Sequence, residues 1–339
     1  MALISVFAFL LLMAIFVAQF LSVVSRSVRY QTSAEAPLPL RPYAFSALEA
    51  TIAVFGEYQR FTEGLAYPAE GWGNPLEWAD LEWSVPPGVM PEIRVDVTDE
   101  TGKIPLTPEN ERVLDQLLET LGVDFNERSE MIDSLADWVD DDGENTKLNG
   151  AEADWYERND EDYPRLPANR PLSSIEELRH IRTWREQFFD ERGQPLPVFE
   201  TFRENVSLLS PGPINLNTAP PLVVEVLGEL GGFYPEDIEE QLAGLDNIRG
   251  TRDDEPLNAT NMAGRIPEDV PVGYSAQLIR ARISVTRGAQ RYFVEALIQA
   301  GGGGDPEQSQ GSVRRRVASS SGEADAFAVI RLSENQALD

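Results

Sequence analysis

The residues best suited to metal chemistry lie in an acidic segment between residues 135 and 152. Its sequence, LADWVDDDGENTKLNGAE, follows the end of a predicted helix and carries six carboxylates within 16 residues. These charges repel one another and the negative end of the helix dipole, so the segment loses stability unless a cation neutralises it. Calcium takes about 6–8 oxygen ligands from carboxylates, amides and backbone carbonyls. The segment is therefore either a calcium-binding loop or a solvated acidic turn.

The spacing of the acids tests one known kind of calcium loop. Asp140, Asp142 and Glu144 alternate as at the start of an EF-hand. However, Asn145 stands where that loop needs glycine, and Ala151 stands where it needs the closing glutamate. The segment is not an EF-hand, and a calcium loop of another kind stays open.

Composition limits the functions of the rest of the chain. The 339 residues include 57 acids against 28 Lys and Arg, a net charge of −29, with an ordinary hydrophobic content of 42%. The hydrophobic content indicates that the body is folded despite its charge. The negative charge opposes binding to nucleic acid and to anionic lipid. No cysteine is present, which excludes disulfides and zinc–thiolate sites. His180 is the only histidine, and no catalytic or phosphate-loop motif occurs. We expect a protein that is not an enzyme.

The N-terminal 24 residues are almost uninterruptedly apolar, and the first charge is Arg26. The stretch is too long for the core of a secretory signal and long enough to span a bilayer as a helix. We expect an uncleaved membrane helix over residues 1–28, with Met1 as the mature N-terminus after removal of a short basic leader. Arg26 and Arg29 by themselves would favour a cytoplasmic body under the positive-inside rule.

Hydrophobic periodicity divides the remaining chain into strands around a helical block. Residues 29–66 form a helix broken by prolines, residues 67–107 contain the first strands, and residues 108–270 are helical. Strands return in 271–300, a flexible linker covers 301–325, and 326–339 hold a possible last strand and tail. A helical block between two groups of strands indicates an insertion into one α+β domain. Whether the last strand joins the sheet stays open.

The helical block contains an internal similarity at a separation of about 110 residues. GKIPLT at 102–107 leads into VLDQLLETLG, and GPINLN at 212–217 leads into LVVEVLGELG. In each copy the apolar helix is followed by a loop and an acidic helix, which predicts two helix–loop–helix units. Chance similarity between short apolar helices is the alternative.

Several motifs in one order resemble the K-class minor pseudopilins of type II secretion systems, known as GspK. They are the apolar N-terminal helix, Asp99-Glu-Thr-Gly-Lys-Ile-Pro-Leu, Asp137-Trp-Val-Asp-Asp-Asp, Asn149-Gly-Ala-Glu152, the segment 171–178 and Ile214-Asn-Leu-Asn-Thr-Ala-Pro220. Ser5 fits as well, because the K class lacks the glutamate that other pilin-like proteins carry at position five. The resemblance implies an N-terminal transmembrane helix and a pseudopilin-like antiparallel sheet domain with a large all-helical insertion.

The resemblance also implies a calcium site, partners and a location. The motifs assign the ligands Asp140, Asp142 and Glu152, with Asp137 and Asn149 as weaker candidates. The partners are the I- and J-class minor pseudopilins and the inner membrane, without nucleic acid. The expected protein is a single-pass inner-membrane protein with its body in the periplasm, a non-enzymatic tip subunit of the secretion pseudopilus. The alternatives are a membrane-anchored periplasmic hydrolase and a helix–hairpin–helix protein that binds nucleic acid.

Overall fold

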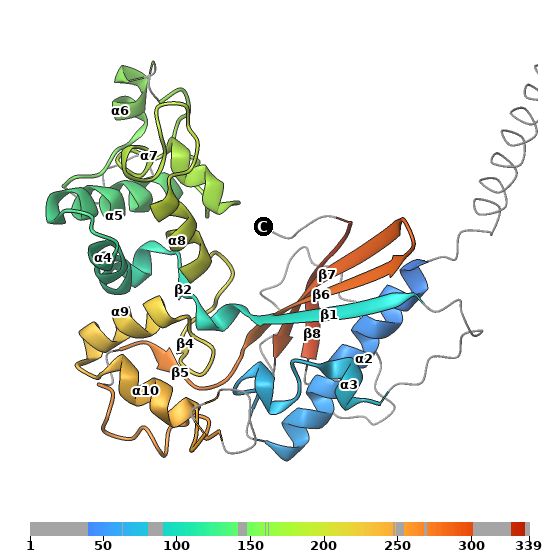
Figure 1. The fold of residues 1–339 in the computed structure, drawn as a ribbon. Helices are drawn as coiled ribbons and strands as arrows, with labels where there is room; N and C mark the ends of the chain where they lie inside the picture. The colour runs from blue at the N-terminus through green and yellow to red at the C-terminus, as the bar shows by residue number, and fades with distance from the viewer. Residues whose placement is uncertain are drawn as a thin grey trace, which may run out of the picture.

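The computed structural model describes the body of the protein as a sheet with one long helix, and a group of shorter helices at one end of the sheet (Figure 1). The described residues are 40–62, 64–80, 91–141, 148–159, 161, 163–246, 248, 254–267, 270–300 and 327–335. The expected membrane helix at 1–28 and the expected linker at 301–325 lie outside them. Within the described ranges, no helix is both long and apolar enough to cross a bilayer.

The sheet has four antiparallel strands in the order β1-β6-β7-β8. They span Glu92–Asp99 (β1), Leu278–Arg287 (β6), Gln290–Ala300 (β7) and Phe327–Glu334 (β8). The β6–β7 hairpin turns at Arg287 and Gly288, as the sequence predicted, and Gly288 takes the positive φ that such a tight turn needs. The C-terminal strand joins the sheet by pairing with β7, which settles the question that the sequence left open.

Helix α2, Leu40–Phe61, lies along one face of this sheet (Figure 1). Its buried side chains recur at helical spacing and include Ala44 and Ala47, whose small size lets the helix approach the strands closely. They pack against alternate residues of the strands, among them Ile283 of β6 and Ala296 of β7. The chain continues through a short 3-10 turn (η1, Pro68–Glu70) and α3 (Pro75–Trp78).

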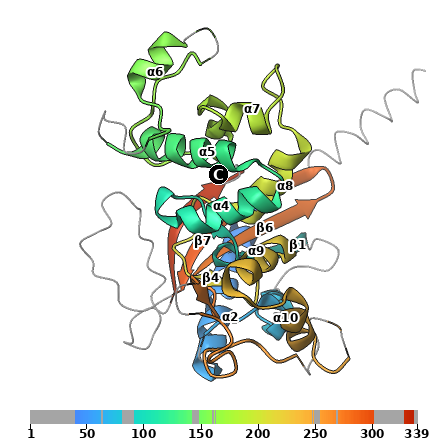
Figure 2. The same cartoon turned by 90° about the vertical axis from the view of Figure 1, so that its left-hand side faces the viewer.

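The helical part begins after a 3-10 turn (η2, Glu100–Gly102) that follows β1. Its helices have these bounds: η3 Pro108–Asn110, α4 Glu111–Thr120, α5 Phe125–Val139, α6 Ala153–Arg158, η4 Ile175–His180, α7 Trp184–Phe188, α8 Pro197–Asn205, α9 Pro221–Gly231 and α10 Pro235–Leu242. One large apolar cluster joins them. The turned view shows α4 and α9 side by side in front of the sheet (Figure 2), and these two helices are in direct contact.

Two expectations about this part need correction. The insertion is not all-helical, because it contains short strands: β2 (Ile104–Pro105) pairs with β3 (Val206–Ser207), and β4 (Ile214–Asn215) pairs with β5 (Val272–Gly273). The apolar spacing of Ser174–Phe188 predicts one helix, but the structure has two short ones in this segment. They are separated where Thr183 has a φ of 65°, a left-handed conformation that no α-helix contains.

The internal similarity corresponds to a structural repeat. In each copy a two-residue strand leads into a helix hairpin and is closed by a parallel pair with a later segment. The backbone bond from Leu106 to Ser207 (2.9 Å) has its counterpart from Leu216 to Gly273 (2.9 Å). Both hairpins turn at a glycine with positive φ, Gly122 at 85° and Gly232 at 69°. The agreement of the pairing and of the turns argues against chance similarity.

Candidate functional site

Three predicted ligands lie together where α5 ends and α6 begins. Asp137 is in the last turn of α5, Asp140 is the residue that caps it, and Glu152 is the N-cap of α6. One carboxylate oxygen from each lies within 4.8 Å of the other two. Asp137 and Glu152 are buried and Asp140 is half-buried. We call these three residues the acid cluster.

Gly150 forms a wall of the acid cluster. A Cβ atom at this position would lie 1.8 Å from Oδ2 of Asp137 and 2.7 Å from its Cγ. The backbone of the loop therefore comes so close to the Asp137 carboxylate that only glycine fits without a shift. The Gly-Ala-Glu motif thus provides both a carboxylate, from Glu152, and the close approach that holds a second carboxylate in place.

Two buried aromatic side chains lie on the two helices that meet at the acid cluster. Trp138 and Tyr156 are buried and pack edge to face with ring centroids 5.4 Å apart. Nε1 of Trp138 donates to Glu177 at 3.2 Å, and the hydroxyl of Tyr156 accepts from the backbone N–H of Arg182 at 3.1 Å. Burial, together with the nearby negative charge of Asp137, raises the pKa of Tyr156. The tyrosine is therefore a neutral structural partner near the site.

The other two predicted ligands have different outcomes. Asp142 lies outside the described residues. Asn149 is fixed through its backbone: its N–H donates to Asp133 at 3.2 Å, and its carbonyl accepts from Nη1 of Arg182 at 3.4 Å. Arg182 in turn lies 3.5 Å from Glu130, so its charge is shared with a carboxylate outside the acid cluster.

The donor set of the acid cluster fits a hard divalent cation. Three carboxylates held within 4.8 Å repel one another, and burial makes this repulsion stronger than it would be in water. Asp137 and Asp140 also lie at the C-terminus of α5, the negative end of its dipole. Oxygen ligands of this kind suit calcium and exclude soft-metal chemistry.

The close approach of Gly150 gives a direct test of the geometry. Gly150→Ala should displace either the loop or Asp137, with a loss of about 1–3 kcal/mol in the free energy of unfolding. Calcium should also stabilise the variant less than the wild type. Gly56→Ala is the matched control, because Gly56 is in α2 with open space around its Cβ position, and there alanine should be neutral or slightly stabilising. Equal melting temperatures and calcium responses in wild type and Gly150→Ala would contradict the close approach.

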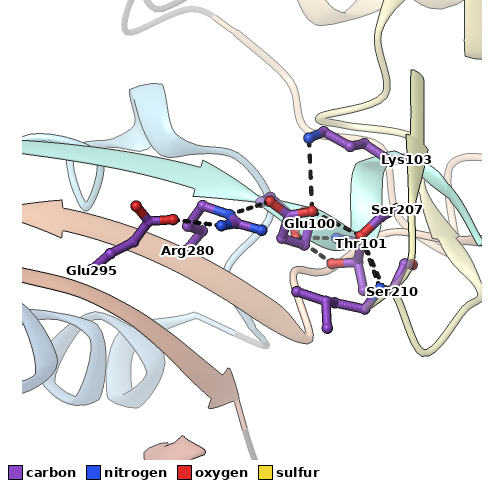
Figure 3. A network of polar contacts seen from close by, with 9 residues as sticks. Glu100, Thr101, Lys103, Ser207, Ser210, Arg280 and Glu295 are labelled. Carbon is purple, nitrogen blue, oxygen red and sulfur yellow. Dashed lines mark hydrogen bonds and ion pairs between the residues drawn. The ribbon is translucent and has the colours of Figure 1, made fainter. Parts of the chain in front are cut away.

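A second polar cluster joins the sheet to the helical part (Figure 3). Nε of Arg280 on β6 donates to Glu100 at 2.6 Å, and its Nη1 contacts Glu295 on β7. The hydroxyl of Ser207 on β3 donates to Glu100 at 2.8 Å. Both carboxylate side chains are only 3% exposed. We call Glu100, Arg280, Glu295 and Ser207 the Arg280 network.

The electrostatics of the Arg280 network favour the charged state of Glu100. Burial alone would raise the pKa of this carboxyl, but the charges of Lys103 and Arg280 and the hydrogen bonds from Arg280 and Ser207 together hold it below its usual range. Sequence patterns did not reveal this network, although one signal was present. Arg280 and Glu295 each interrupt a strand whose neighbouring residues are apolar, which is where a buried ion pair would stand.

The neighbouring Asp99 connects β1 to the second repeat. Its carboxylate accepts hydrogen bonds from the side chains of Asn215 and Thr218, each at 2.7 Å, and from the backbone N–H of Thr101 at 2.8 Å. Burial raises the pKa of Asp99, and these hydrogen bonds oppose the rise. The Asp99-Glu-Thr-Gly-Lys motif therefore connects the sheet to the helical part. Asp99 is hydrogen-bonded to the second repeat, and Glu100 is bonded to Arg280 of the sheet and to Ser207 of β3.

Comparison with known proteins finds a family model that matches part of the chain. Residues 95–191 match the family model described as type II secretion system (T2SS), protein K. We call this matched segment, residues 95–191, the K domain. This K domain includes the acid cluster, Asp99 and Glu100, and it confirms the resemblance drawn from the sequence motifs.

The fold comparison extends beyond the K domain. The structure is similar to a chain of the crystal structure of the GspK–GspI–GspJ complex from the type 2 secretion system of enterotoxigenic Escherichia coli. The match has a TM-score of 0.54 at 16% sequence identity and covers 92% of this chain and 99% of the other. No curated protein sequence matches the chain significantly. The fold is thus similar over nearly the whole length of both chains, although only 16% of the residues are identical.

Proposed function

We propose that the protein is a non-enzymatic minor pseudopilin that works at the tip of a type II secretion pseudopilus and supports protein export across the outer membrane. The observation that carries this proposal is the K domain at residues 95–191, embedded in a fold that matches a GspK–GspI–GspJ chain over 92% of this sequence. The sheet with α2 packed on it forms one part of the body, and the helical part lies at one end of this sheet.

The proposal includes a location and a metal. The apolar residues 1–24 act as a single membrane anchor in the inner membrane, and the acidic body lies in the periplasm. Calcium is held by Asp137, Asp140 and Glu152, with Asp142 and Asn149 from the adjoining loop as further ligands. When bound, calcium neutralises the carboxylates and ties the end of α5 to the start of α6. The close contact at Gly150 and the hard oxygen donors support this assignment.

The other functions considered for the sequence have less support. A hydrolase would need carboxylates that reach a substrate, but Asp137 and Glu152 are almost fully buried. A helix–hairpin–helix protein presents positive charge to phosphates, whereas Glu236 and Asp237 are exposed beside the second hairpin. Arg128, at the first hairpin, is buried and paired with Asp115 at 2.9 Å.

Complex formation tests the proposed function. The full chain in neutral detergent, mixed with the I- and J-class pseudopilins of the same operon in calcium buffer, should co-purify as one complex. Duplex DNA added to the same protein should give no salt-sensitive shift in a gel assay, because the body carries a net charge of −29. Recovery of the chain alone in calcium buffer would contradict the proposed partners.

A further inference from the structure

The sheet face opposite α2 carries a groove of about 450 Å³ lined by three arginines. Ile93, Val95 and Val97 of β1 pack toward α2, so the alternate residues of this strand point to the other face. On that face lie Arg94 of β1, Arg282 of β6 and Arg291 of β7, with Ser284 and Thr286 of β6 between them. We call these five residues the arginine groove.

The strand register brings the three arginines together. Arg94 stands directly across from Ser284, and Arg291 directly across from Thr286. The guanidinium of Arg282 lies over the ring of Phe293, 4.7 Å from its centroid. Phe293 is the strand partner of Ser284, so this contact directs the side chain of Arg282 toward Ser284. The three arginines and the two small hydroxyl residues therefore lie on neighbouring positions of one sheet face and line the same groove.

The charges of Arg94 and Arg291 are available to a ligand. Arg282 instead stands directly across from Asp96 of β1 and Glu295 of β7. Arg94 and Arg291 are exposed, and neither forms an ion pair with any residue of the described ranges. By contrast, Arg280, one step along the same strand face, is used in the Arg280 network. Glu92 and Asp96 line the groove from β1 and leave it a net charge of one positive unit. That balance suits one phosphate group better than a long polyanion.

The position of the arginine groove suggests where such a phosphate comes from. Arg291 and Thr286 adjoin the β6–β7 turn, and Glu92 is the first residue of β1. Helix α2 begins at the same end of the sheet, because Arg41 in its first turn pairs with Glu334 at 2.7 Å, beside Tyr292. The apolar residues 1–24 thus connect to the body at the end that holds the arginine groove.

We propose that the arginine groove binds the phosphate of an anionic phospholipid headgroup. Guanidinium forks bind phosphate oxygens in pairs, and the hydroxyls of Ser284 and Thr286 can donate further hydrogen bonds. The overall charge of −29 repels an anionic bilayer elsewhere, so this local attraction would orient the body with its groove toward the lipid. The inference rests on the membrane anchor of the proposed function.

Hydrogen exchange on the full chain in lipid nanodiscs tests the inference. Discs made of phosphatidylcholine mixed with phosphatidylglycerol should slow amide exchange in peptides covering 92–96 and 282–291. The expected slowing is about threefold or more relative to discs of phosphatidylcholine alone. The double variant Arg94→Gln and Arg291→Gln should lose this difference. The lysine versions should keep only part of it, because lysine lacks the bidentate fork. Arg60→Gln, which removes an exposed arginine at the other end of α2, should keep all of it.

Each other outcome has a defined meaning. Equal exchange in both kinds of disc would overturn the inference and leave the proposed function intact. Protection by inorganic phosphate alone in phosphatidylcholine discs, without an effect of phosphatidylglycerol, would show a site for free phosphate instead of lipid. Protection that appears only when the I- and J-class pseudopilins are added would make the groove a protein interface. A chain that does not co-elute with the discs would contradict the anchor itself.

Discussion

Calcium should raise the melting temperature of the full chain in neutral detergent, and a chelator should lower it. A ligand that binds only the folded state at a hundred times its Kd stabilises that state by about 2.7 kcal/mol. Magnesium should have little effect, because it prefers a tighter octahedral shell than a flexible acidic loop provides. Thermal unfolding followed by circular dichroism over a calcium titration measures the effect.

Variants assign the calcium effect to the acid cluster. Asp137→Asn, Glu152→Gln and Asp142→Ala should each abolish most of the calcium-dependent shift. Glu157→Gln should leave it unchanged, because Glu157 is an exposed acid on α6, the helix that Glu152 caps. The same rise in melting temperature for wild type and for the Asp137, Glu152 and Asp142 variants would mean that the acidic segment is only a solvated turn.

Arg280→Met should destabilise the protein by about 3–5 kcal/mol, because it removes the guanidinium that two buried carboxylates share and leaves Lys103, 3.7 Å away, as the cation beside Glu100. Glu100 and Glu295 have nearly fully buried side chains, so water cannot replace the guanidinium. Chemical denaturation of the full chain at pH 7 measures the loss. Arg60→Met is the matched control: its ion pair with Glu57 is exposed and contributes about 0–1 kcal/mol.

The pH dependence separates a charge effect from a packing effect. In the wild type the pKa of Glu100 is held low, so its contribution is present above about pH 4.3, the usual glutamate value, and is lost as the pH falls through the lower folded value. In Arg280→Met the Glu100 carboxyl loses one of the two positive charges that hold its pKa low, so it takes up a proton more easily and the deficit should shrink between pH 7 and pH 4. Glu100→Gln with Glu295→Gln should restore part of the stability in that background. A deficit that does not change with pH would point to lost packing instead.

The sequence by itself determined most elements with a strong local pattern. The alternation in β1, β6 and β7 and the helical spacing in α2, α4, α5 and α9 were readable, because apolar residues recur along each element at the period of a strand or a helix. The repeat was also visible, since both copies keep the same short strand and the same glycine turn. Helix α8 and the break at Thr183 were not predicted, because distant packing decides them.

The chemistry of the acidic segment was likewise readable in kind but not in geometry. Aspartates and glycines in one stretch suggested oxygen ligands for calcium, yet spacing alone could not distinguish a site from a solvated turn. Only the fold shows that Glu152 comes back to Asp137 and Asp140, and that Gly150 closes on the Asp137 carboxylate. The reason is that residues 137 and 152 belong to different helices, whose relative placement depends on the aromatic packing of Trp138 and Tyr156.

Tertiary structure alone decided where the positive charge lies. The net charge of −29 predicts a body that repels anions, and the arginines of β6 alone do not show which charges of the other strands lie beside them. Pairing of β1, β6 and β7 gathers Arg94, Arg282 and Arg291 from positions nearly 200 residues apart onto one face. It also puts Arg280 between two buried carboxylates instead of in solvent. Net charge is a sum over residues, whereas a binding surface depends on which residues the register makes neighbours.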